Sequence, residues 1–133
     1  MTWTSVVEPL VGVAEAFDLA RGGNRELAAR ILRQEFEKLQ SPNQKVELCE
    51  WIANCFEDLH DFDQAADWYE MAAALSLSQT GSPLINAIMA TREYEKAVEC
   101  YDLRVKDGDE DATESIQKCL EMIRGLNHEY AAA

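Results

Sequence analysis

The sequence has few residues that interrupt helices or bind metals. Its 133 residues include 6 glycines, 3 prolines and 2 histidines, and the four cysteines form no C-x-x-C pair. No stretch approaches the roughly 20 apolar residues of a membrane-spanning helix, and the first residues lack the basic segment of a secretory signal. These absences argue against a membrane protein, a zinc site and a disulfide framework. We therefore expect one cytoplasmic domain over residues 1–133 with reduced, mostly buried thiols.

Positive charge is also scarce. Twelve lysines and arginines stand against 25 aspartates and glutamates, which gives a formal net charge of −13. A surface this acidic repels phosphate groups, so we expect no binding to nucleic acid or to anionic membranes. The scarcity is strongest between Val46 and Thr91, where eight acidic residues occur and no lysine or arginine does. This stretch is either a solvated helix face or an acidic recognition surface.

Motifs for catalysis and cofactor binding are missing too. The sequence has no H-E-x-x-H zinc motif and no G-x-x-x-x-G-K-[ST] phosphate loop. Cys55 lies five residues before His60 but across a predicted helix end, which is a weak arrangement for a nucleophile and its base. Three aspartates after Lys106 begin like a calcium loop, yet Ala112 stands where that loop requires glycine. We therefore predict a protein that is not an enzyme, with no metal and no cofactor.

What the sequence does have is helical periodicity. Apolar residues recur at the i, i+3, i+4 and i+7 positions of one helix face. One such set is Cys49, Ile52, Ala53 and Phe56. Serine–proline pairs at 41–42 and 82–83 each combine a capping serine with proline at the first helical position. We predict an all-α chain with helices over residues 5–20, 25–40, 43–58, 63–77, 83–90, 94–106 and 111–124.

Two segments repeat a pattern of acidic, aromatic and small residues. Residues 61–69 (DFDQAADWY) are echoed by residues 93–101 (EYEKAVECY), and in both copies a tyrosine follows four residues after an alanine. The distance between the copies is close to the roughly 34 residues of the tetratricopeptide repeat, and the chain resembles that family. The residues that carry the resemblance are Ile52, Ala53, Phe56, Ala65, Tyr69 and Ala72.

The resemblance implies a solenoid of three antiparallel helix pairs, over residues 5–40, 43–77 and 82–106, followed by a capping helix over 111–124. In that family the first helix of each pair lines a concave groove. The predicted partner-binding residues on this groove are Glu15, Asp18, Glu47, Glu50, Trp51, Asn54, Glu57, Asp58, Asn86 and Met89. A basic or amphipathic peptide would fit such a surface, with Trp51 as its apolar anchor. The alternative for Trp51 is a place in the core.

Two functions are compatible with this arrangement. The first is a scaffold or adaptor that binds a segment of another protein. The second is a dedicated chaperone, because the size, acidity and repeat number also resemble the class II chaperones of type III secretion, which hold apolar clients soluble. Such a chaperone is expected to be poorly behaved without its client, or to form a homodimer through apolar residues of the first helix such as Val6, Val7 and Leu10. Tetratricopeptide co-chaperones that bind acidic tails are a poorer match, since Glu50 stands where they have a lysine.

Overall fold

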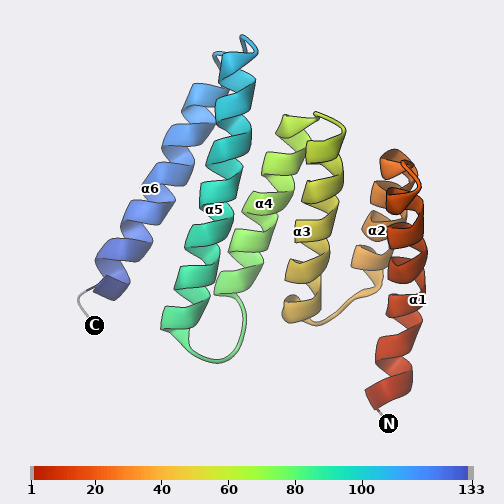
Figure 1. Ribbon diagram of the computed structural model, residues 1–133. Helices are drawn as coiled ribbons and strands as arrows, with labels where there is room; N and C mark the ends of the chain where they lie inside the picture. Colours follow the sequence, from red (N-terminus) through yellow and green to blue (C-terminus); the bar gives the residue numbers. More distant parts are fainter. Residues whose placement is uncertain (1, 132–133) are drawn as a thin grey trace.

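The computed structural model describes residues 2–131, and its side chains are described over residues 12–130. Six helices follow one another in a single row (Figure 1). They are α1 (Thr2–Arg21), α2 (Arg25–Lys38), α3 (Pro42–Asp58), α4 (Phe62–Leu77), α5 (Pro83–Lys106) and α6 (Ala112–Ala131). Each helix runs antiparallel to the one before it and packs mainly against its neighbours in the chain. Residues 2–131 contain no strand, so the prediction of an all-α fold is confirmed.

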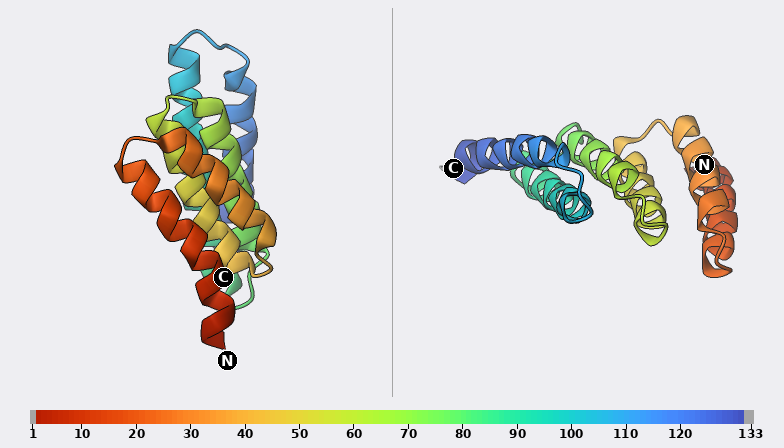
Figure 2. Two further views of the ribbon diagram at one scale, coloured as in Figure 1. Left: turned by 90° about the vertical axis from the view of Figure 1, so that its right-hand side faces the viewer. Right: turned by 90° about the horizontal axis from the view of Figure 1, so that it is seen from above.

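The row is long and thin, with α1 and α6 at its two ends (Figure 2).

Local chemistry sets where its helices begin and end. Asn24, Asp61 and Ser82 each cap a helix, because the side-chain oxygen accepts a hydrogen bond of 3.3 Å from the backbone N–H three residues later. Gly23 and Gly108 adopt φ values of 89° and 101° in the turns after α1 and α5, a conformation that glycine tolerates best. These turns reverse the chain, so that successive helices lie side by side.

Small residues line the contacts in the middle of the row. Ala53 of α3, Ala65 of α4 and Ala97 of α5 are fully buried. Alanine at a helix contact lets two backbones approach closely, and larger side chains such as Phe56 and Tyr69 fill the space beside it. The residues that were predicted to pack the middle of the chain are therefore in the core.

The prediction for the third helix pair is wrong. The helices expected over residues 83–90 and 94–106 are one continuous helix, α5, of 24 residues. The intervening segment contains neither glycine nor proline, and the Thr91 hydroxyl donates a hydrogen bond of 2.8 Å to the Ala87 carbonyl within the helix. The antiparallel neighbour of α5 is therefore α6, which continues to Ala131 rather than ending at residue 124. Residues 2–131 thus hold six helices where seven were expected.

Candidate functional site

The predicted partner-binding residues lie on α1, α3 and α5. Most of them reach the surface. Glu15, Asp18, Glu47, Asn54 and Asp58 are exposed, and Glu50, Trp51, Glu57 and Met89 are half-buried. Asn86 differs, because it is only 7 % exposed and its amide donates a hydrogen bond of 2.8 Å to the carbonyl of Gln79. Asn86 therefore fixes the loop between α4 and α5. The predicted dimer contact of Val6, Val7 and Leu10 lies outside the described side chains.

Trp51 forms one wall of a small cavity between α1, α2 and α3. Its ring meets the ring of Phe17 edge-on, with the ring centroids 4.2 Å apart. The cavity has a volume of about 160 Å³, and Arg25, Asn54 and Cys55 also line it. Trp51 is therefore neither wholly in the core nor free in solvent. An apolar wall with polar groups beside it is the usual character of a pocket that receives a side chain.

The acidic stretch is less negative in the folded chain than its sequence predicts, because cations reach it from other helices. Arg25 Nη1 of α2 lies 3.2 Å from Asp58 Oδ2, and Lys96 Nζ of α5 lies 3.7 Å from Glu50 Oε2. Arg104 Nε of α5 lies 3.2 Å from Asp63 Oδ2. All three cations lie outside residues 46–91, so a count of charges within that stretch does not find them.

Two tyrosine hydroxyls hold further acidic residues. The hydroxyl of Tyr69 donates to Glu57 and lies 2.8 Å from Asn54 Oδ1, and the hydroxyl of Tyr101 donates to Glu70 at 2.5 Å. Burial, and then these hydrogen bonds, raise the pKa of both tyrosines. Both hydroxyls thus remain protonated donors. These bonds tie α4 to α3 and α5 to α4.

Acidic residues without such partners remain on the face formed by α1 and α3. Glu15 and Glu47 are exposed, and neither takes part in an ion pair within residues 12–130. Among residues 12–130, Asp18 pairs only with exposed Arg21, one turn along the same helix. Glu15 of α1 and Glu47 of α3 therefore leave their carboxylates available to a partner on two of the helices that line the Trp51 cavity.

A buried carboxyl group lies between α3 and α5. Glu93 is 6 % exposed, and its Oε2 has no hydrogen-bond partner. Its Oε1 lies 3.9 Å from Lys96 Nζ. Burial, together with the nearby Glu50 carboxylate, raises the pKa of Glu93 to about 7, although Lys96 opposes this shift. Glu93 is therefore partly protonated at neutral pH.

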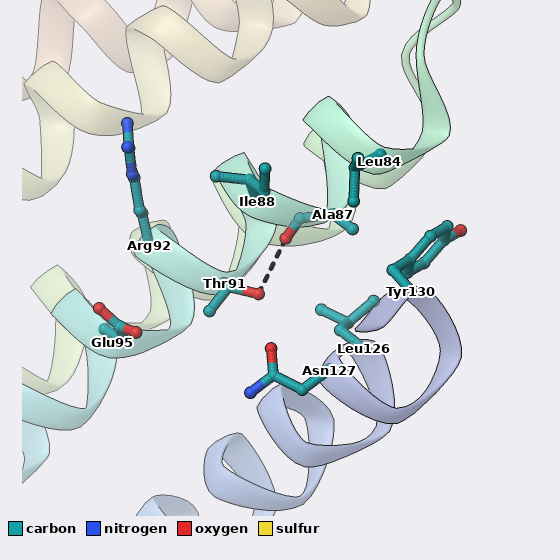
Figure 3. A pocket seen from close by; sticks show the side chains of 9 residues that line it. All are labelled: Leu84, Ala87, Ile88, Thr91, Arg92, Glu95, Leu126, Asn127 and Tyr130. Atoms are coloured by element: carbon teal, nitrogen blue, oxygen red, sulfur yellow. Dashed lines mark hydrogen bonds between the residues drawn. The ribbon is translucent and has the colours of Figure 1, made fainter. Parts of the chain in front are cut away.

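A larger cavity, which was not predicted, lies between α5 and α6. Its volume is about 390 Å³. Figure 3 shows Leu84 and Ala87 of α5 opposite Leu126 and Tyr130 of α6. Arg92, Glu95 and Asn127 also line it, away from Tyr130. The sequence prediction missed this cavity because it ended the last helix at residue 124, before Leu126 and Tyr130. The i, i+4 spacing of those two residues is the signal that would have extended the helix.

The four cysteine thiols are all buried and free. Burial raises the pKa of Cys49, Cys100 and Cys119 to about 12. Burial also raises the pKa of Cys55. The nucleophilic thiolate form is therefore disfavoured at each position.

Within the part of the chain that the structure describes, no group of three or more histidines, cysteines or acids could hold a metal ion. The described helices also include none that is long and apolar enough to span a bilayer.

Comparison with protein-family models found no match, and no curated protein or solved structure matched the chain either. The likeness to the tetratricopeptide repeat therefore stays a prediction from the residues that carry it.

Proposed function

We propose that this chain is a non-catalytic protein-interaction module, a tetratricopeptide-like helical repeat that binds a basic or amphipathic segment of a partner protein. The observation that carries the proposal is the half-buried Trp51, which stands beside an open cavity of about 160 Å³. A tryptophan in this position offers a large apolar surface to an incoming side chain, as the central residues of protein interfaces do. The binding surface is the face formed by α1 and α3.

The charge of this face favours a basic partner. Glu15 of α1 and Glu47 of α3 are exposed, and no lysine or arginine of residues 12–130 neutralises them. A cation of the partner would meet them without displacing an internal ion pair. The net charge of −13 adds long-range attraction, which speeds the encounter and weakens as salt rises.

The arrangement of the helices supports a repeat architecture. Short turns join antiparallel helices, each helix packs on the next, and Ala53 and Ala65 occupy the close contact between α3 and α4. Rows of this kind expose long surfaces to partners.

Because all four cysteines are free, we place the protein in the cytoplasm, where thiols stay reduced.

Selection from a random peptide library, followed by titration of the enriched peptides, tests the proposal. We expect peptides rich in lysine or arginine with one large apolar residue, and affinities that fall as salt rises. Trp51→Ala should weaken binding at least about tenfold. The matched control is Trp68→Ala, because Trp68 is also half-buried and meets a phenylalanine edge-on, but on α4 against Phe36 of α2. Salt-independent binding, or equal losses in both variants, would contradict the proposal.

A second function is favoured by the cavity between α5 and α6, namely a chaperone that holds an apolar client. Leu84, Ile85 and Ile88 at this end of α5 are 45–57 % exposed, which is unusual for large aliphatic side chains. Such a chaperone is expected to be a homodimer through the first helix. Ile88→Asp should then abolish client binding while Trp51→Ala leaves it intact, whereas the first function predicts the reverse.

A further inference from the structure

The carboxyl groups of Glu50 and Glu93 share a single ammonium group. Lys96 Nζ lies 3.7 Å from Glu50 Oε2 and 3.9 Å from Glu93 Oε1, and it stands 5.5 Å from the centre of the Tyr69 ring. Lys96 and Glu50 are partly exposed, whereas the side chain of Glu93 is almost entirely buried. The cluster therefore extends from the surface inward, with Glu93 at its inner end, and connects α3 to α5.

One lysine does not satisfy both carboxylates. Glu93 Oε2 is buried without a hydrogen-bond partner, and an ionised oxygen in that position loses its hydration without compensation. A proton on Glu93 removes the charge and allows its carboxyl group to donate a hydrogen bond to Glu50. Lys96 then has one carboxylate to neutralise instead of two. The protonated cluster is thus electrically balanced, and the ionised cluster carries one excess negative charge.

We propose that Glu50, Glu93 and Lys96 form a proton-operated latch that ties α5 to α3, closed while Glu93 is protonated and weakened when Glu93 ionises. The other titratable groups that face the cluster are Cys49 of α3 and Tyr69 of α4. Burial keeps both protonated across the neutral range, so neither changes its charge there. The proton on Glu93 is therefore the one that operates the latch. This inference does not depend on the proposed partner.

The direction of the pH effect follows from Glu93 alone. Its pKa is about 7 in the folded chain, against the ordinary value of 4.5. The folded chain consequently retains a proton that the unfolded chain loses. The latch contributes fully below about pH 4.5, and its contribution falls as the pH rises through about 7. A shift of this size corresponds to a change on the order of a hundredfold in the folding equilibrium constant.

Urea unfolding at pH 5 and at pH 8 tests the latch. The variants are Glu93→Gln, which imitates the protonated form, and Glu99→Gln as a matched control on the exposed side of the same helix. From pH 5 to pH 8, the folding equilibrium constant of the wild type and of Glu99→Gln should fall through Glu93 ionisation. We expect this fall to exceed that of Glu93→Gln by a factor on the order of a hundred. Identical pH dependence in all three proteins would overturn the proposal.

Carbon-13 NMR titration of the glutamate carboxyl groups in the wild-type chain gives an independent test that needs no variant to fold. Glu93 should titrate near neutral pH, well above the ordinary glutamate value of 4.5. In Lys96→Gln the Glu93 midpoint should move higher still, because the ammonium group favours the ionised form. A Glu93 midpoint at the ordinary value of 4.5 would refute the latch, and so would a midpoint that does not respond to Lys96→Gln.

Discussion

The middle of the row and its C-terminal edge both contain large apolar residues, but these are buried in the middle and partly exposed at the edge. In the middle, α3, α4 and α5 meet through fully buried alanines, and tyrosine hydroxyls bond to acids on the neighbouring helix. At the edge, α5 and α6 leave a cavity of about 390 Å³ beside exposed leucine and isoleucine side chains. The apolar residues near the start of α5 are as hydrophobic as those of the core. What differs is their position, because they lie where α5 and α6 leave a cavity, whereas the core residues lie where α3, α4 and α5 are in close contact.

The two regions also differ in how their charged side chains are paired. Near the middle, Glu50 and Asp58 each meet a cation from another helix. At the edge, Arg92 and Glu95 line the cavity, and neither forms an ion pair with any residue between 12 and 130. The ion pairs of Glu50 and Asp58 therefore join helices in the middle of the row. The edge keeps both its apolar and its charged groups available for contact.

The largest effect that separates the two regions should come from a core truncation. Ile52 of α3 is 0 % exposed, so Ile52→Ala removes buried methyl groups and leaves a void in close-packed surroundings. We expect a loss of about 2–5 kcal/mol in the free energy of unfolding. Urea denaturation followed by circular dichroism measures this loss. A change below about 1 kcal/mol would mean that the middle of the row is as loosely packed as the edge.

A smaller effect should come from the tyrosine hydroxyls that join the middle helices. Tyr69→Phe leaves Glu57 without its hydroxyl donor, and we expect a loss of about 1–2 kcal/mol. Tyr101→Phe should act similarly through Glu70. The control is Tyr94→Phe on α5, since residues 12–130 supply no hydrogen bond to the Tyr94 hydroxyl. If all three variants are equally stable, the hydroxyl bonds contribute nothing to the difference between the regions.

Local sequence predicted most of this fold because local chemistry determines it. The helix expected over 63–77 is α4, Phe62–Leu77, and it begins where the Asp61 side chain caps it. The break expected between residues 90 and 94 did not form, and that segment contains neither glycine nor proline. A continuous helical preference prevailed, and α5 formed without interruption.

The candidate site was less accessible to sequence reasoning. Periodicity places Glu47 and Trp51 one turn apart on a partly exposed face, and the structure agrees. Periodicity cannot reveal that Lys96 meets Glu50 or that Arg25 meets Asp58, since these partners are far apart in sequence and only packing brings them together. For the same reason, the buried carboxyl group of Glu93 has no signal in the sequence.

The smallest effect on stability should be found at the edge. Ile85 is 57 % exposed near the start of α5, so Ile85→Ala removes methyl groups that already contact water. We expect a change within about 0.5 kcal/mol, although the same side chain is truncated as in Ile52→Ala. Ile85→Ser should in addition reduce the fluorescence of a dye that binds exposed apolar surface, because this residue adds to the patch beside the α5–α6 cavity. A loss of stability comparable to that of Ile52→Ala would show that the edge is packed like the core. Unchanged dye binding would show that the apolar surface lies elsewhere.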